Sequence, residues 1–414
     1  MSPTQVLFRG ARVFDGHSPD LRATDVLVRD GTIAEVAPNL AVEDADVVDC
    51  GGRVLMPGMI DAHVHVYATS LNVTQVVTTP ATYRALYASV FLRHMLSCGF
   101  TTVRDTGGAD VGLYRGLAEG LIDGPRLYYG GRVMSQTGGH GDFRPHDHDG
   151  WAECCACPGA THIDFFTAVV DGPDAMRRAV REELRRGAHH IKIMGSGGVA
   201  SPNDPLDRCQ FNDEEIRTAV EECERHGSYV LAHCHPTIAI RRCVELGVRC
   251  IEHGTIIDEP TAAFVAERGA YIVPTMSVIF ALLEDGPKLG LPPVSYQKLL
   301  QVSGHALEGL RIMRQAGVRM GFGTDLLGGH HRRHGTEFSI RAKVLTPLEI
   351  LRSACTVNAE ILNETGKLGC IRPGAHADVL VVDGNPLEDI HILAADGDRL
   401  PVIMKAGQFS KRAI

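Results

Sequence analysis

The stretch Leu55-Met-Pro-Gly-Met-Ile-Asp-Ala-His63-Val-His65-Val66 decides how the rest of the chain is interpreted. Its apolar residues indicate a short buried strand that ends at two histidines. Because successive side chains of a strand alternate between its faces, His63 and His65 point to the same side, and Asp61 precedes them on it. Two imidazoles on one face suit a metal ion, but the same pair also occurs as ordinary polar residues at a strand end.

The composition is that of a globular protein with a large core, since 44% of the 414 residues are hydrophobic and 22% are charged. The length fits one α/β barrel of about 250 residues plus a smaller module. A net charge of -9 argues against nucleic acid as a partner. No apolar stretch approaches the roughly 20 residues that cross a bilayer, so we expect no membrane association.

The 12 cysteines are expected to be reduced thiols in a cytoplasmic protein. The cluster Cys154-Cys155-Ala-Cys157 leaves a metal or redox role open as a minor alternative, because no second CxxC follows at zinc-finger spacing.

Both ends of the chain carry short strand-like runs separated by turn signals such as Asp30-Gly31 and Gly51-Gly52. Neither end has enough strands to bury a core alone. We therefore predict a composite β-sandwich domain built from residues 1–54 and 366–414.

The residues between these ends alternate between strand and helix patterns, which predicts a parallel sheet. The candidate strands are 55–65, 100–105, 126–134, 190–194, 229–233, 249–253, 271–275 and 318–325. Eight such units predict the α/β class with a (β/α)₈ TIM barrel over residues 55–365. Two long connections, 135–170 and 276–304, follow strands and are expected to be substrate-binding loops.

Helix starts are marked by capping signals within this region. Asn212 precedes an acidic first turn, and Thr346-Pro-Leu-Glu349 is a capping box with proline at the first helical position.

In a barrel the catalytic residues come from the C-terminal ends of the strands. Those ends carry His63, His65, Lys192, His233, His253 and Asp325. Taken singly, each has a structural interpretation, such as a core histidine, a snorkelling lysine or a capping aspartate. Their convergence on one face favours a metal centre.

Four imidazoles and one carboxylate exceed what a single catalytic ion with an open position binds. Two divalent ions, zinc foremost, about 3.5–4 Å apart would use all of them. Lys192 is a poor ligand as an ammonium, but carboxylation by CO₂ would convert it into a carbamate that bridges both ions.

These motifs resemble the amidohydrolase superfamily over essentially the whole chain. Within it the chain is similar to metal-dependent prolidases and carboxypeptidases near imidazolonepropionase, a branch that includes ochratoxin-hydrolysing amidohydrolases. The motifs that carry the resemblance are Val54–His65, Gly138-Gly-His-Gly-Asp142, Ile191–Gly198, Phe211–Glu215, Gly323-Thr-Asp325, Thr356–Glu360, Gly369–Asp378 and Gly384-Asn-Pro386.

The resemblance implies the role of each ligand. His63, His65 and Asp325 would bind one metal, His233 and His253 the other, and carboxylated Lys192 both. A metal-bridging hydroxide would attack the amide carbonyl, and Asp325 would be the catalytic residue that moves its proton to the leaving amine.

It also implies the substrate contacts. A histidine and a tyrosine in such positions hold the α-carboxylate of the substrate, which assigns that role to His140 and Tyr229. Tyr229 lies on the same strand face as His233, four residues before it. The alternative for His140 is that Gly138-Gly-His-Gly only forms a tight turn. Arg104 and Asp105 are interpreted as supporting residues, with Arg104 a weaker candidate for carboxylate recognition.

We therefore expect an enzyme that removes the C-terminal residue from dipeptides or N-acyl amino acids, with ochratoxin-type amides also accommodated. The alternative is a cyclic-amide hydrolase of the imidazolonepropionase kind, against which Lys192 argues, and a non-catalytic scaffold is more remote. A homo-oligomer is expected from the resemblance alone. The histidines of His146-Asp-His148-Asp and of His330–His334 are expected to be solvated rim residues, with contact of His148 and His331 with substrate as the alternative. Trp151 lies in the same long loop as His146 and His148.

Overall fold

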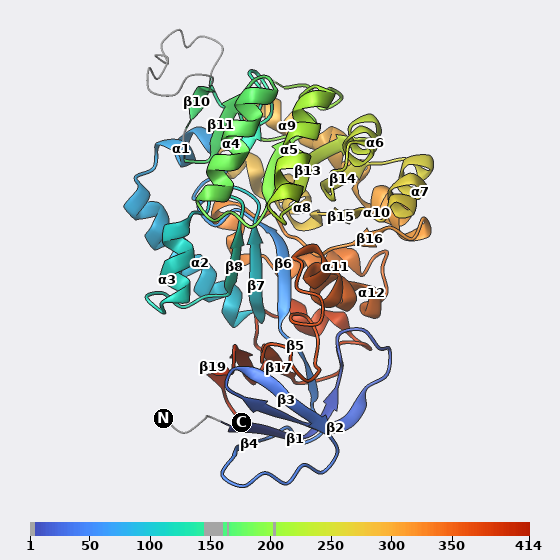
Figure 1. Ribbon diagram of the computed structural model, residues 1–414. Coiled ribbons are helices and arrows are strands. Elements are labelled where there is room, and N and C mark those ends of the chain that lie inside the picture. Colours follow the sequence, from blue (N-terminus) through green and yellow to red (C-terminus); the bar gives the residue numbers. More distant parts are fainter. Residues whose placement is uncertain (1–4, 145–159, 164, 202–203) are drawn as a thin grey trace.

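The barrel predicted for the central residues is present in the computed structural model, which describes residues 5–144, 160–163, 165–201 and 204–414 (Figure 1). Adjacent barrel strands pair in parallel. They are β6 (Met59–Val64), β7 (Phe100–Asp105), β8 (Arg126–Tyr129), β9 (Val133–Ser135), β12 (Ile191–Met194), β13 (Val230–Pro236), β14 (Cys250–Ile256), β15 (Tyr271–Val273) and β16 (Arg319–Met320).

The third predicted strand, 126–134, is divided in two. β8 pairs with β7, whereas β9 pairs with β12. Gly131 between them has a φ of +70°, a left-handed conformation that glycine adopts at little cost, and the turn ends the first ladder.

The barrel closes between its first and last strands. The Ala62 amide donates to the Phe322 carbonyl and the Asp325 amide donates to the His63 carbonyl, both at 2.8 Å. Asp61, which shares the face of His63, accepts a 2.6 Å hydrogen bond from the Thr324 hydroxyl. Closure therefore carries Asp325 to the side of His63.

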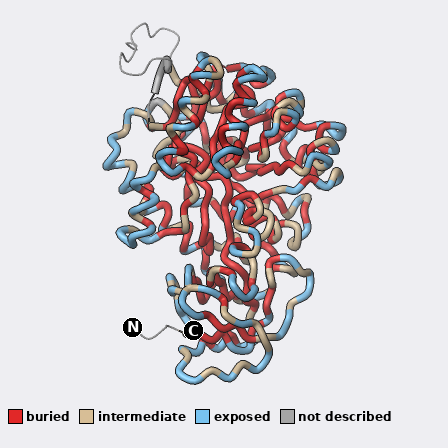
Figure 2. Tube along the Cα trace, in the orientation of Figure 1, coloured by how far each residue is buried: buried red, intermediate tan, exposed pale blue. Residues whose placement is uncertain are grey.

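The helices cover the outside of the barrel, and buried residues concentrate along its strands (Figure 2). These outer helices are α2 (Ala81–Ser97), α3 (Val111–Ala118), α4 (Pro173–Arg185), α5 (Asp213–Arg225), α6 (Thr237–Glu245), α7 (Glu259–Arg268), α10 (Ala306–Gln315), α11 (Thr336–Arg341), α12 (Pro347–Arg352) and α13 (Asn358–Ile361). The predicted caps form, because Asn212 with Glu215 and Thr346 with Glu349 each make both bonds of a capping box. Among the described helices, none combines the length and apolar character needed to cross a membrane.

The long connections that follow the barrel strands contain regular secondary structure. The expectation of a loop over 276–304 is wrong, because this segment forms α8 (Met276–Asp285), the short 3₁₀ helix η1 (Gly286–Leu289) and α9 (Pro293–Ser303). The connection after β6 contains α1 (Val73–Thr78), and the connection after β9 contains the antiparallel pair β10 (Ala160–Ile163) and β11 (Thr167–Val170).

The chain termini combine into one β domain, as predicted. Its strands form one hydrogen-bonded sheet in the order β19-β18-β17-β5-β1-β2-β3, with β4 on β1, and their buried side chains share a core of their own. They are β1 (Gln5–Val13), β2 (Arg22–Arg29), β3 (Thr32–Ala37), β4 (Asp46–Asp49), β5 (Val54–Pro57), β17 (Val379–Val382), β18 (Val402–Lys405) and β19 (Gln408–Arg412). Because β5 pairs with β1 and β17, the chain enters the barrel at Gly58, slightly after the boundary predicted at residue 54.

Candidate metal centre

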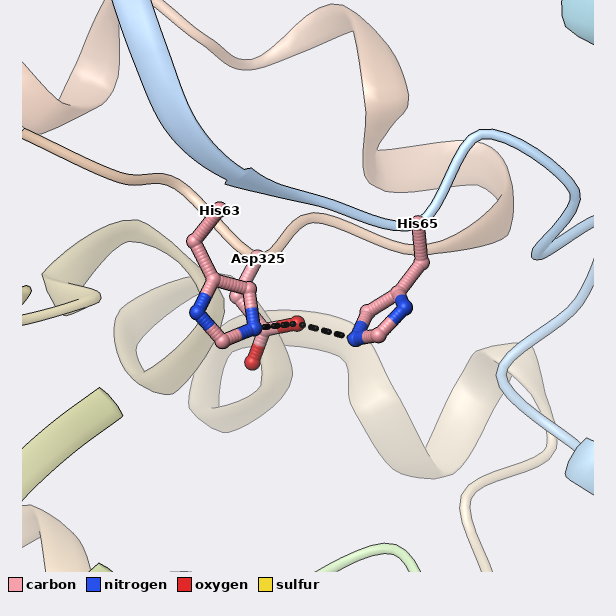
Figure 3. Close-up of side chains that lie close together, drawn as sticks. All are labelled: His63, His65 and Asp325. Carbon is pink, nitrogen blue, oxygen red and sulfur yellow. Dashed lines mark ion pairs between the residues drawn. The ribbon is translucent and has the colours of Figure 1, made fainter. Parts of the chain in front are cut away.

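Three of the six predicted ligands form a compact group at the C-terminal end of the barrel (Figure 3). The Nε2 atoms of His63 and His65 lie 3.4 and 3.5 Å from Oδ1 of Asp325. Possible ligand atoms of all three residues lie within 4.8 Å of one another. Strand alternation in β6 and barrel closure thus assemble two imidazoles and one carboxylate as a metal ion requires.

The other predicted ligands adjoin this group. The His253 ring lies 5.0 Å from that of His63 and 4.6 Å from that of His233. Nδ1 of His253 is 3.9 Å from Oδ2 of Asp325. Lys192 is 2% exposed and lines the same cavity as these residues. The structure therefore brings all six residues to one end of the barrel.

Hydrogen bonds set the orientation of the histidine rings. Nδ1 of His63 donates to Oε2 of Glu252 at 2.5 Å, and Nδ1 of His65 donates to the Gly107 carbonyl at 2.9 Å. Nδ1 of His253 pairs with the Thr275 hydroxyl at 2.7 Å. Partners of this kind fix the ring and its tautomer in metal sites, and they leave Nε2 of His63 facing Asp325, whereas Nε2 of His65 also lies 3.3 Å from the Thr106 hydroxyl.

Burial controls the charge of the ligands. It lowers the pKa of the His65 imidazole to about 4 and that of His63 well below its ordinary value. Burial also lowers the pKa of the Lys192 amine, and it raises the pKa of the Asp325 carboxyl to about 8. Neutral imidazoles are the form that binds metals, and a less basic lysine has more of the neutral amine that reacts with CO₂.

Two ligands have an unusual backbone conformation. His253 has a φ of 69° and Asp325 a φ of 54°, both in the left-handed region that non-glycine residues rarely adopt. Such conformations concentrate at functional sites, where the surrounding structure imposes them.

A cavity of about 1060 Å³, partly open to solvent, leads to these ligands. Its lining is largely apolar, and helices α1, α8 and α9 supply many of these side chains. The apolar residues of the lining include Leu71, Val73, Val76, Phe143, Phe166, Val278, Ile279, Leu282, Leu291, Leu299, Val302 and Leu327. The cavity therefore combines candidate metal ligands with apolar side chains that suit an apolar group of a substrate.

His140 lies in this cavity and stacks on His233, with ring centroids 4.3 Å apart. Its Nδ1 donates to Oδ2 of Asp204 at 2.9 Å, which leaves Nε2 for a ligand. Gly198 permits this stacking, because a Cβ there would meet the His140 and His233 rings at 2.4 and 2.6 Å. The glycine-rich segment around His140 therefore does more than form a tight turn.

The prediction that Tyr229 contacts substrate does not fit its position. Tyr229 immediately precedes β13 and shares the inward face of this strand with His233, but four residues separate them by about 13 Å. Its hydroxyl accepts a 3.5 Å hydrogen bond from Nη1 of Arg104 inside the barrel, and Tyr229 is absent from the cavity lining.

His235 is the cavity residue that our interpretation of the sequence missed. It lines the cavity two residues after His233, and their ring centroids are 4.8 Å apart. The available signal was the alternation His233-Cys-His235, the same pattern as that of His63 and His65.

Arg104 and Asp105 are supporting residues. Fully buried Arg104 donates from Nη2 to Oε1 of Glu252 at 2.7 Å and from Nε to the Ala62 carbonyl at 2.6 Å, away from the cavity. Asp105 accepts from the backbone amides of Val66, Gly107 and Ala109.

The expectation that His330 and His331 are solvated is wrong. His330 is buried against Asp285, and His331 stacks on Phe91 with ring centroids 3.8 Å apart. His334 is also buried. His146, His148, Trp151 and the Cys154–Cys157 cluster lie outside the described residues.

The donor set fits a pair of divalent ions. The side chains supply imidazole nitrogens, one carboxylate and a buried lysine, and this mixture suits zinc, manganese or cobalt. His63, His65 and Asp325 would hold one ion and His233 and His253 the other.

Comparison with known proteins shows the family to which the chain belongs. The model of the Amidohydrolase family matches residues 54–408. An ochratoxinase of Aspergillus niger is 32% identical over 358 residues, covering 82% of this chain and 72% of that protein. A solved amidohydrolase structure is 47% identical with a TM-score of 0.95, covering 99% of both chains. A prolidase structure in complex with N-methylphosphonate-L-proline is 45% identical with a TM-score of 0.94, covering 99% of this chain and 100% of that one. The chain belongs to the amidohydrolase family.

Proposed function

We propose that this hydrolase is a binuclear metal-dependent enzyme that releases the C-terminal residue from dipeptides or N-acyl amino acids. The observation that carries the proposal is a single cavity lined by the six candidate ligands, by His140 and His235, and by many apolar side chains. Prolidase and ochratoxinase relatives support amide bonds as the substrate class.

The metal ions would act as Lewis acids on the scissile carbonyl and lower the pKa of water. His63, His65, His233, His253 and Asp325 would hold them, with carboxylated Lys192 between them. Lys192 is suited to this role because its burial lowers the pKa of its amine. A carbamate forms from the neutral amine, so burial favours the modification.

Asp325 would move the proton. Its carboxylate is 3.4 Å from the Nε2 atom of His63 and therefore lies among the ligands. From there it would accept a proton from the attacking water and deliver it to the leaving nitrogen. Its backbone bond to His63 keeps the carboxylate in this position.

His140 and His235 would recognise the free carboxylate of the substrate. Both rings border His233 at centroid distances of 4.3 and 4.8 Å, so a carboxylate between them would lie close to the metal ligands. Asp204 orients His140 by accepting from Nδ1. The apolar side chains of the lining would take a hydrophobic side chain or acyl group. A prolidase relative was solved in complex with N-methylphosphonate-L-proline, which supports an amino-acid-derived substrate.

The test is hydrolysis of matched N-acyl amino acids that carry either a free or an amidated C-terminus, by metal-loaded protein with bicarbonate present. Cleavage confined to free carboxylates is the expected result. Cleavage of both series would contradict the exopeptidase assignment. Hydrolysis of neither series would contradict the proposed function and favour cyclic amides as substrates.

A further inference from the structure

A second cluster of metal-ligating side chains lies outside the catalytic cavity. His94 and Cys98 are four residues apart at the C-terminal end of α2, and Asp396 approaches them from the turn between η4 (Ile390–Ala394) and β18. Possible ligand atoms of the three residues lie within 4.8 Å of one another. Helical spacing of four places His94 and Cys98 on one face, so the ligand pair is built into α2.

The distance between Sγ of Cys98 and Nε2 of His94 matches that expected between two ligand atoms of a tetrahedral zinc site. Zinc binds cysteine sulfur at about 2.3 Å and imidazole nitrogen at about 2.0–2.1 Å, so a tetrahedral angle separates the two atoms by about 3.6 Å. Sγ of Cys98 is 3.6 Å from Nε2 of His94. A thiol–imidazole hydrogen bond has a similar length, and only a measurement of bound metal separates the two.

A second histidine, which is buried, lies next to this cluster. His334 is fully buried 6.0 Å from His94, centroid to centroid, and neither of its ring nitrogens has a hydrogen-bond partner among the described residues. Burying an imidazole without partners is costly, so His334 is an unsatisfied polar side chain next to the cluster.

The third ligand comes from a turn that packs closely on α2. A Cβ on Gly397 would lie 1.9 Å from the Ser97 carbonyl oxygen, which shows how near this turn is to the helix end. Asp396 itself is exposed and has a φ of 45°. Its carboxylate therefore reaches the pair from the solvent side, where an ion can enter.

We propose that His94, Cys98 and Asp396 form a structural site for one zinc-like divalent ion that joins α2 of the barrel to the segment preceding β18 of the β domain. One thiolate, one imidazole and one carboxylate suit zinc. The site is separate from the catalytic centre, whose proposed ligands contain nitrogen and oxygen only.

This difference in donors supplies the test. Full-length protein, kept reduced, is loaded with Co²⁺, and the near-ultraviolet thiolate-to-cobalt charge-transfer band is recorded together with metal content per chain. We expect the band in the native protein and its loss in Cys98→Ala, with one ion fewer per chain. Cys223→Ala is the matched control, because Cys223 is another buried helical cysteine, and it should keep the band.

Asp396→Asn covers the case in which Cys98→Ala fails to fold, because position 396 is exposed and asparagine tolerates the left-handed conformation. It should retain the fold and weaken Co²⁺ binding at the thiolate site by at least about tenfold. Absence of the band from cobalt-saturated native protein, an unchanged band in Cys98→Ala or unchanged affinity in Asp396→Asn would each overturn the proposal. These readouts do not depend on catalytic activity, so they are independent of the proposed function.

Discussion

Glu252 hydrogen-bonds His63 of the candidate metal centre, with its Oε2 atom 2.5 Å from Nδ1 of the imidazole. Its other oxygen accepts from Nη2 of Arg104 at 2.7 Å, and all three side chains are buried. The pair joins strands β6 and β14, which supply ligands to both proposed ions. A carboxylate in this position fixes the ring and increases its basicity as a ligand.

Glu252→Gln should weaken metal binding about 10–100-fold, because His63 loses its anionic partner. Removing one member of the buried pair with Arg104 should also destabilise the fold by about 3–5 kcal/mol. Chelator competition and thermal unfolding measure the two effects. Glu349→Gln, at a partly exposed helix cap, is the control and should leave metal affinity unchanged. Native metal affinity in Glu252→Gln would refute the role of this contact.

Asp325→Asn should keep much of the metal and lose about 10²–10⁴ in kcat, because an amide cannot accept and return the proton. Metal content and single-substrate kinetics are measured on the same preparation. Asp285→Asn removes a carboxylate that contacts His330 outside the cavity lining, and should retain native kcat. Substantial turnover by the Asp325→Asn enzyme would exclude Asp325 as the proton-transfer residue.

Lys192→Ala should abolish activity, and short carboxylic acids such as acetate should restore part of it by taking the place of the carbamate. The native enzyme should gain activity with bicarbonate during metal loading, because burial lowers the pKa of Lys192 and the amine becomes available to CO₂. Lys288→Ala, on the short helix η1 outside the cavity lining, is the control and should need no rescue. A fully active Lys192→Ala enzyme would rule out a bridging role.

Gly198→Ala should displace His140 from His233, because the new methyl group would meet both rings at under 3 Å. We expect a raised KM for free-carboxylate substrates, and metal content is measured as well because His233 is also a proposed metal ligand. Gly304→Ala adds a methyl group with no neighbour closer than 3.7 Å and should be neutral. Unchanged KM in Gly198→Ala and in His140→Asn together would remove His140 from the substrate site.

Asp204 should make folding stability depend on pH in the acid range. Burial alone would raise its pKa, but His140 and Lys298 outweigh burial and hold the pKa below its ordinary value. The group therefore stabilises the fold above the unfolded pKa of about 3.9, and this contribution is lost as the pH falls through the lower folded pKa.

Thermal unfolding of metal-free protein checks this dependence. The Tm difference between native protein and Asp204→Asn should be largest near neutral pH and shrink below pH of about 4. Asp207→Asn, an exposed neighbour, should show little difference at any pH. A gap between native protein and Asp204→Asn that grows on acidification would contradict this sign.

The local pattern of the sequence determined most of the elements and placed the candidate metal ligands at strand ends. The alternation of strand side chains pairs His63 with His65, and capping residues such as Asn212 and Thr346 mark helix starts where they are found. These features depend on contacts a few residues apart, which the order of residue types specifies directly. The convergence of the strand ends then followed from the barrel, because parallel strands present their C-terminal ends on one face.

Tertiary structure alone decided which residues reach the cavity and which support it. Tyr229, just before β13, and His235, within it, both lie at even spacing from His233, yet only His235 lines the cavity, because depth along the strand decides the outcome. Glu252 meets His63 across 189 residues of chain, and helices α8 and α9 turn an expected loop into part of the apolar lining. Such contacts depend on barrel closure and on packing between distant segments, which local periodicity does not contain.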